Sequence, residues 1–246
     1  MEDGEEKKKY SISAFFPMYN DDGTVELMVK KLKETLPKFT DDWEIIMVDD
    51  CSPDKSGEIA DQLAKDDSRL KVVHHEKNKG YGGALKSGFK TATKDLIFYT
   101  DGDAQYDIYE LERLMPHINE YDVVNGYKTN RADGIHRKIV GEIYNFGMHL
   151  AFNLKVKDVD CDFRLMHKKI FNQIELESDS GMICVEMMKK IGDAGLTIKD
   201  VPVNHYDRQH GKSQFFNPKR VIKTLAGLVK LWINIVLLRK GGKKKK

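Results

Sequence analysis

Two aspartates, Asp101 and Asp103, follow an apolar run and are separated by one glycine in the stretch DLIFYTDGDAQYD. If the run is a buried strand, both carboxylates lie at its carboxyl end, where α/β sheets bind ligands. Carboxylate oxygens, with the Gln105 amide beside them, suit Mg²⁺ or Mn²⁺, and such an ion often bridges to a substrate diphosphate. A turn explains an Asp-Gly pair equally well in isolation, so this motif alone leaves both interpretations open.

A second acidic pair, Asp49 and Asp50, ends the apolar run WEIIMV. One of these carboxylates could accept hydrogen bonds from a base or a ribose. The Ser52-Pro53 pair that follows is typical of a helix N-cap and its first turn, which predicts a helix start there. Capping does not explain two adjacent acids at the end of another strand.

Two glycine-containing segments imitate phosphate-binding loops and are excluded. The segment GYGGALKSG has Leu85 where a dinucleotide-binding loop needs its third glycine, and polar residues precede it directly. Gly211-Lys212-Ser213 resembles the end of a P-loop, but Tyr206 stands where the first glycine is required. Neither NAD binding nor ATP hydrolysis is supported.

The elements that must position these acids follow from hydrophobic periodicity. Short apolar runs alternate with helical patterns, which predicts an α/β fold with a mostly parallel sheet and helices on both faces. The expected strands are SISAFF, WEIIMV, LKVVHH, DLIFYT and YDVVNG, and one expected helix covers TVELMVKKLKETL. A second apolar stripe comprises Ile139, Ile143, Phe146, Leu150 and Leu154, and a further helix is expected across Met182 to Ile191.

Composition limits the classes of protein. The 246 residues are 40% hydrophobic and 33% charged, which suits one globular catalytic-size domain. Three scattered cysteines indicate a reducing compartment without disulfides. Six positive charges fall in the last eight residues, so the rest of the chain is net negative, which argues against nucleic-acid binding. The start of the chain has no apolar signal segment, so a cytoplasmic protein is expected.

The segment from Val221 to Leu238 predicts an amphipathic helix. Its polar residues form one narrow stripe, and its apolar residues are expected to face an apolar medium. The stripe consists of Lys223, Gly227, Lys230 and Asn234; the apolar face consists of Leu225, Leu228, Leu231, Trp232, Ile235 and Leu238. A helix lying on an anionic membrane surface fits better than a membrane span, because a central lysine costs about 3 kcal/mol to insert. A core or oligomer helix is the alternative.

Six motifs in order give the chain a family resemblance. They are the PxYN opening at Pro17 to Asn20, VDDCSPD, NKGYGGALKSGF, TDGDAQ, DVDCDFRL and VPVNHYDRQHGKS. From about Ser11 to Phe216 the sequence resembles family 2 inverting glycosyltransferases with the GT-A fold. The last two motifs are most similar to the branch that transfers sugars to polyprenyl or dolichyl phosphate, which commonly binds membranes.

The resemblance implies roles for individual residues. It implies that the metal is held by Asp101, Asp103 and Gln105, and that Asp162 is the catalytic base or orients the acceptor. The expected nucleoside and donor contacts are Pro17, Tyr19, Asn20, Asp49, Asp50, Gly80 and Asp101. The cations available to phosphate groups are Arg131, Arg137, Arg164, Arg208 and Lys212.

We therefore expect a metal-dependent enzyme that moves a sugar from a UDP- or GDP-sugar to a polyprenyl phosphate at the cytoplasmic face of the cell membrane. A glycan hydroxyl as acceptor is the main alternative; a non-catalytic membrane adaptor and a nucleotidyltransferase are less well supported. The expected parts are a polar tail (1–9), the GT-A catalytic domain (10–216), the membrane-interface helix (217–240) and a basic tail (241–246). Whether the protein forms a homo-oligomer stays open.

Overall fold

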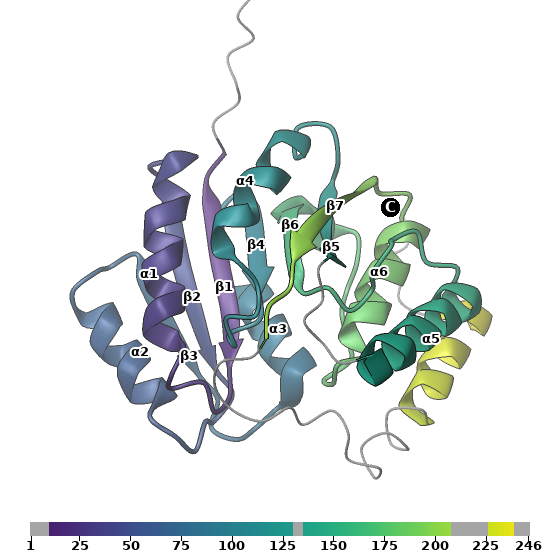
Figure 1. The fold of residues 1–246 in the computed structure, drawn as a ribbon, viewed down its shortest axis with the longest axis horizontal. Helices are drawn as coiled ribbons and strands as arrows, with labels where there is room; N and C mark the ends of the chain where they lie inside the picture. Colours follow the sequence, from purple (N-terminus) through teal and green to yellow (C-terminus); the bar gives the residue numbers. More distant parts are fainter. Residues whose placement is uncertain (1–9, 130–134, 208–225, 239–246) are drawn as a thin grey trace, which may run out of the picture.

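The structure is a computed structural model that describes residues 10–129, 135–207 and 226–238. One seven-stranded sheet runs through it in the order β3-β2-β1-β4-β6-β5-β7 (Figure 1). The strands are β1 Ile12–Met18, β2 Trp43–Asp49, β3 Leu70–His74, β4 Leu96–Thr100, β5 Val123–Thr129, β6 Phe163–His167 and β7 Ile198–Asn204. Strand β6 alone among them is antiparallel to its neighbours β4 and β5. The mixed, mostly parallel sheet expected from the sequence is confirmed.

Helices cover both faces of the sheet. The helices are α1 Val25–Thr35, α2 Ser56–Lys65, α3 Gly80–Thr91, α4 Leu111–Leu114, α5 Ile135–Phe152 and α6 Ile183–Asp193, with a C-terminal helix at 226–237 whose last turn is π-helical. Helices α1, α2 and α4 pack on one face, and α3, α5, α6 and the C-terminal helix pack on the other. Every residue of β1, β2 and β4 is buried because both faces of these central strands are covered.

The antiparallel direction of β6 determines where the aspartates that directly precede this strand lie. Thr100, the last residue of β4, pairs with Phe163, the first residue of β6. The start of the antiparallel β6 therefore meets the carboxyl ends of the parallel strands at one edge of the sheet. This edge brings Asp162, directly before β6, next to Asp101, directly after β4.

The expected start of the helix after β2 needs correction. Helix α2 begins at Ser56 and not at Ser52-Pro53. The Asp54 carboxylate accepts hydrogen bonds from the Ser56 N–H (3.1 Å) and hydroxyl (2.6 Å), whereas the Ser52 N–H donates to Asp49 (2.9 Å). The segment from Asp50 to Asp54 is therefore a loop, and its Ser52 N–H contacts the last residue of β2. All three cysteines are free, as expected.

The C-terminal helix packs on the protein through the face that was expected to meet an external apolar medium. Leu228, Leu231 and Ile235 are buried in the core cluster that also contains α6. Gly227 lies against Met182, and the Trp232 indole N–H donates to the Ala151 carbonyl (2.7 Å). For these residues the expected orientation was wrong. In the described part of the chain, no helix combines the length and the hydrophobicity that crossing a bilayer requires.

The packing of α3 on β1 yields a test of the core. A Cβ at Gly88 would lie 2.4 Å from ring atoms of Phe15, which is wedged between Phe89 and Tyr99. We expect Gly88→Ala to lower the free energy of unfolding by about 1 to 3 kcal/mol in denaturant melts.

The matched control is Gly192→Ala in α6, where a new Cβ meets nothing within 4 Å. That change should leave stability unaltered or raise it by up to about 1 kcal/mol. Equal stabilities for the two variants would contradict the packing described here.

Candidate functional site

The loop after β4 is shaped for close packing at the sheet edge. A Cβ at Gly102 would lie 2.4 Å from the Pro17 carbonyl oxygen, so only glycine fits between the two acids. The next residues form a tight turn in which Ala104 has a φ of 58° and the Gln105 N–H donates to the Asp103 carboxylate (3.1 Å). A non-glycine residue in this conformation costs roughly 1–2 kcal/mol, and such strain concentrates at functional sites.

Asp101 shares this edge with two other carboxylates. Its carboxylate accepts a hydrogen bond of 2.6 Å from the Tyr81 hydroxyl of α3. Burial raises the pKa of Asp101 well above its ordinary value, and the negative charges of Asp162 and Asp103 raise it further. These three aspartates therefore form one group of interacting negative charges, at the edge where the sequence predicted a metal and a diphosphate.

Asp162 is held by three donors from different elements. Its Oδ1 accepts hydrogen bonds from the Tyr99 hydroxyl of β4 (3.2 Å), the Arg164 guanidinium of β6 (2.9 Å) and the Cys184 thiol of α6 (3.2 Å). Burial, followed by the charge of Asp162, raises the pKa of Cys184, so its sulfur stays protonated as a donor. The carboxylate is consequently fixed in orientation while remaining at the edge of the sheet.

Arg164 lies beneath the site and cannot receive a phosphate group. Its side chain is 0% exposed and bonds internally to Tyr99, Asp162, the Asn125 amide oxygen (2.7 Å) and the Val159 carbonyl (2.5 Å). The expectation that Arg164 is available to a phosphate was wrong. Its guanidinium instead compensates buried negative charge and ties β6 to β4 and β5.

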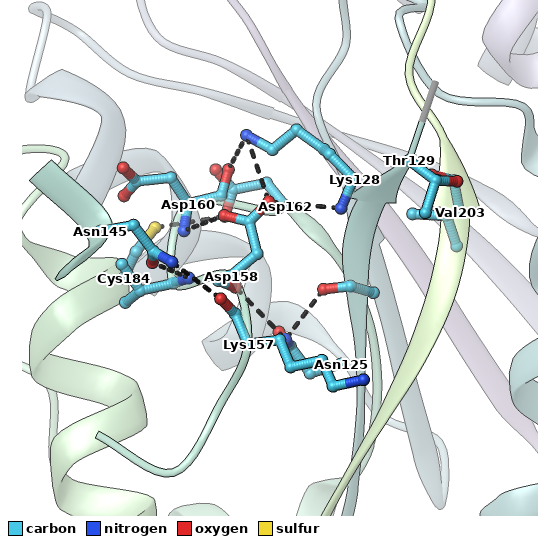
Figure 2. A network of polar contacts seen from close by, with 12 residues as sticks. Asn125, Lys128, Thr129, Asn145, Lys157, Asp158, Asp160, Asp162, Cys184 and Val203 are labelled. Atoms are coloured by element: carbon cyan, nitrogen blue, oxygen red, sulfur yellow. Dashed lines mark hydrogen bonds and ion pairs between the residues drawn. The ribbon is translucent and has the colours of Figure 1, made fainter. Parts of the chain in front are cut away.

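A second acidic group lies beside Asp162, on the segment that enters β6 (Figure 2). The Lys128 ammonium of β5 donates to the Asp160 carbonyl (2.7 Å) and lies 4.0 Å from the Asp158 carboxylate. Burial raises the pKa of Asp160 to about 6; Lys128 opposes this effect, and Asp162 and Asp158 add to it. Asn145 of α5 holds the same segment by donating to the Lys157 carbonyl (2.8 Å) and accepting from the Val159 N–H (3.3 Å).

Asp50 organises the loop that begins α3. Its carboxylate contacts the buried His75 ring (2.6 Å) and accepts from the backbone N–H groups of Lys79 (2.7 Å) and Gly80 (2.9 Å). Gly80 has a φ of +80°, and a side chain there would collide with the Asp179 carbonyl. Asp50 thus positions this loop against the sheet edge.

The other expected nucleoside contacts follow β1 and β2. Asp49 lies 3.0 Å from the His74 ring and accepts from the Ser52 N–H, so its carboxylate is also held by the protein. Pro17 is buried in β1, whereas Tyr19 is 44% exposed and Asn20 has a φ of 61°. Tyr19 therefore presents an aromatic ring to solvent at the same edge.

Four expected cations lie outside what the structure describes: Arg131, Arg208 and Lys212 by position, and Arg137 by its side chain. Sequence reasoning also missed residues that shape the site: His75, Tyr81, Tyr99, Lys128, Asp158, Asp160 and Cys184. The alternating acids of DVDCD were a visible signal for two of them.

The oxygen ligands at this sheet edge fit a hard divalent cation that also binds a diphosphate. Asp101 and Asp103 supply carboxylate oxygens, and burial, followed by the charges of Asp162 and Asp103, raises the pKa of Asp101 although Lys128 opposes this effect. In residues 10–129, 135–207 and 226–238, no three acidic, histidine or cysteine side chains are arranged as a complete cation site. Mg²⁺ and similar ions are commonly bound by one or two carboxylates with substrate phosphates completing the shell.

The raised pKa of Asp160 predicts that the stability of the protein depends on pH. Because its pKa is higher in the folded chain than its ordinary 3.8, the folded state binds a proton more tightly. This contribution to stability is full below about pH 4 and is lost as pH rises through about 6. Asparagine carries no charge at any pH, so Asp160→Asn should raise the free energy of unfolding relative to wild type. We expect this gain to be larger at pH 7.5 than at pH 4.5 by on the order of 1 kcal/mol.

Thermal melts at both pH values measure this difference. Asp66→Asn, at an exposed aspartate after α2, is the surface control in the same melts. A stability difference for Asp160→Asn that is independent of pH would show that Asp160 titrates normally.

Curated relatives and solved structures are similar to most of the chain. It is 30% identical over 203 residues to Glycosyltransferase AglD of Haloferax volcanii, covering 78% of this chain and 32% of that protein. It is 29% identical over 211 residues to the undecaprenyl-phosphate 4-deoxy-4-formamido-L-arabinose transferase of Aeromonas hydrophila, covering 83% of this chain and 62% of that protein. The chain thus spans about a third to two thirds of the length of these relatives.

The fold matches that of glucosyl-3-phosphoglycerate synthase from Mycobacterium tuberculosis, solved with Mn²⁺, UDP-glucose and phosphoglyceric acid. The TM-score is 0.66 at 15% identity, covering 91% of this chain and 80% of that one, which supports the fold alone. Residues 13–175, more than half of the sequence, match the family described as Glycosyl transferase family 2. The chain belongs to glycosyl transferase family 2.

Proposed function

We propose that this protein is an inverting, metal-dependent glycosyltransferase that moves a sugar from a UDP- or GDP-sugar to a polyprenyl phosphate at the cytoplasmic face of a membrane. Support comes from relatives named for transfer to undecaprenyl phosphate and for dodecaprenyl-phosphate galacturonate synthesis, the latter from Rhizobium johnstonii and 26% identical over 208 residues. That protein is matched over 61% of its length and this chain over 83%.

The observation that carries the proposal is that strands β4 and β6 bring Asp101, Asp103 and Asp162 together at one sheet edge. Asp101 and Asp103 would hold Mg²⁺ or Mn²⁺ together with the donor diphosphate, with Gln105 beside them. The ion would neutralise the charge that develops on the leaving nucleoside diphosphate. Solved structures of the same fold contain Mn²⁺ and UDP, which agrees with this assignment.

The nucleoside would bind along the ends of β1 and β2. The exposed Tyr19 ring offers a stacking surface for a base, next to Pro17 and Asn20. Asp50 acts through the loop at Lys79 and Gly80, which it fixes by backbone hydrogen bonds. Asp49 is the better candidate for a ribose contact, because its partners are the half-exposed His74 and one backbone N–H.

A phosphate acceptor changes the task of Asp162. A phosphate monoester has a second pKa near ~6, so its oxygen is already deprotonated at neutral pH and needs no base. Asp162, held by Tyr99, Arg164 and Cys184, would instead orient the acceptor for attack on the sugar carbon from the side opposite the diphosphate.

The acceptor phosphate needs positive charge near this acidic group. Lys128 lies beside Asp158 and Asp160 and supplies one cation. Arg131 and Arg137 follow the end of β5 in sequence, and Arg208 and Lys212 follow the end of β7. Because these strands end at the same sheet edge as the acids, we propose these four residues as further phosphate ligands.

A sugar hydroxyl is the alternative acceptor. One observation favours it: Asp162 is a well-oriented carboxylate, which is what deprotonation of a hydroxyl requires. Radiolabelled UDP- and GDP-sugars, tested with undecaprenyl phosphate, undecaprenol and soluble glycans, distinguish the two acceptors. Label in undecaprenyl phosphate alone supports the proposal, and label in a glycan alone refutes it.

Asp103→Asn tests the assignment of the metal and diphosphate. We expect this change to lower transfer to undecaprenyl phosphate at least about 100-fold, because a ligand to the ion is lost while the buried fold stays intact. Initial rates with Mn²⁺ and with a chelator provide the measurement. Asp66→Asn, a change of the same chemistry on the surface, should keep wild-type activity. Full activity of Asp103→Asn in chelator would remove the metal from this site.

A further inference from the structure

Exposed apolar side chains are concentrated on two helices. In the described part of the chain, ten large hydrophobic side chains are exposed, and seven of them lie on α5 or at the C-terminal helix. On α5 they are Ile143, Phe146 and Leu150, with exposed fractions of 67%, 71% and 78%. On the C-terminal helix they are Val229, Ile233 and Leu237, with 60%, 40% and 61%, and Leu238 follows with 54%. Such concentration marks an interaction surface.

Each set forms one stripe along its helix. Positions 143, 146 and 150 are separated by three and four residues, and positions 229, 233 and 237 by four and four, so each set shares a face. The opposite faces are also apolar: Phe152 of α5 and Leu231 of the C-terminal helix are buried in the same core cluster. The outer stripes therefore contribute nothing to the core of the described protein.

The two helices are neighbours (Figure 1). Trp232 connects them through its hydrogen bond to the Ala151 carbonyl, and both helices pack on the cluster that includes α6. We name the six residues of the two stripes, Ile143, Phe146, Leu150, Val229, Ile233 and Leu237, the outer apolar surface.

The charges around the outer apolar surface are mostly positive, which favours an anionic partner. Lys155, three residues after the end of α5, and Lys230 of the C-terminal helix are exposed, and Glu142 is the exposed acid in residues 141–152 of α5. Directly after Leu238 the sequence continues with Arg239, Lys240 and four further lysines at its end. Two copies of this chain joined through the surface would bring these cations together, whereas an anionic lipid surface would attract them.

The outer apolar surface is also close to the candidate site. Asn145 of α5 holds the segment that carries Asp158, Asp160 and Asp162 by two hydrogen bonds. Burial, and then the charge of the nearby Asp160, raises the pKa of the Tyr144 hydroxyl on the inner face of α5. A layer outside α5 would thus lie about one helix diameter, roughly 10–12 Å, from these carboxylates.

We propose that the outer apolar surface inserts into the interface of an anionic bilayer and that α5 thereby brings a lipid-borne phosphate to the segment of Asp158 to Asp162. The binding step stands on the exposed stripes and the charges; the delivery step rests on the proposed function. The membrane-facing residues are then the outer stripes, and not the buried Leu228, Leu231 and Ile235.

Vesicle co-sedimentation of the full chain tests the binding step. Glutamine at the three positions of the α5 stripe, Ile143→Gln, Phe146→Gln and Leu150→Gln, removes apolar contact while keeping a good helix former. We expect binding to vesicles of 30% phosphatidylglycerol to fall about tenfold or more, because each side chain would otherwise be buried in the interface. Leu27→Gln on α1, at an exposed leucine remote from these helices, is the control and should bind like wild type.

A second measurement uses the two tryptophans. Trp232 is partly buried against the core cluster and α5, next to Ile233 of the outer apolar surface, and Trp43 is buried at the start of β2. Brominated lipids should quench the fluorescence of wild type bound to vesicles and should not quench Trp232→Phe. Equal vesicle binding by wild type and the α5 variant, or equal quenching with and without Trp232, would overturn the proposal. Loss of a dimer in the α5 variant, measured by sedimentation, without vesicle binding by wild type, would assign the surface to a second copy and also overturn it.

Soluble geranyl phosphate separates this proposal from the proposed function. If both hold, the α5 variant transfers sugar to geranyl phosphate at the wild-type rate but transfers poorly to undecaprenyl phosphate in vesicles. Equal loss with both acceptors overturns the delivery step. If wild type binds vesicles yet transfers to neither phosphate, the proposed function fails and the membrane surface stands.

Discussion

The buried guanidinium of Arg164 is the interaction on which the candidate site depends. It bonds to Tyr99 of β4, Asn125 of β5, the Val159 carbonyl and the Asp162 carboxylate, so one side chain connects three strands and the segment entering β6. An unpaired charge at such a position would be costly, and these hydrogen bonds together with the Asp162 carboxylate make it tolerable. The guanidinium thus helps to hold the Asp162 carboxylate at the sheet edge in one orientation.

The antiparallel β6 gives this arrangement its location. Reversal of one strand brings its first residues to the edge where the other strands end, and so adds Asp158, Asp160 and Asp162 to Asp101 and Asp103. Lys128 and Arg164 are the cations that act on these acids within the described residues. Burial, and then the charges of the neighbouring aspartates, raise the pKa values of Asp101 and Asp160. This concentration of buried carboxylates is the physical reason to propose a divalent cation and a bound diphosphate here.

Much of this could be predicted from the sequence, for identifiable reasons. Apolar runs bounded by polar turns located β1 to β5, and acids directly after such runs located Asp101 and Asp103, since a strand end determines where the next residue lies. Strand β6 carries an arginine among apolar residues, and sequence alone does not tell a buried, compensated Arg164 from a surface cation. The contacts of Cys184 and Tyr81 join segments distant in sequence, so no local pattern contains them.

The C-terminal helix shows a different limit of prediction from the sequence. It is apolar on two faces, and periodicity identifies the faces without telling which one packs on the protein. Contacts with Ala151 and Met182 decide that the Leu228 face is inside.

In the proposed function, the acids at the end of β4 hold a nucleoside diphosphate through a divalent cation. Calorimetric titration of the full chain with UDP and with GDP, each with Mn²⁺ and with a chelator, tests it most directly. We predict that one of the two nucleotides binds at least about tenfold more tightly with Mn²⁺, because the ion joins the diphosphate to Asp101 and Asp103. Equal dissociation constants with Mn²⁺ and with chelator, or no binding of either nucleotide, would contradict the claim.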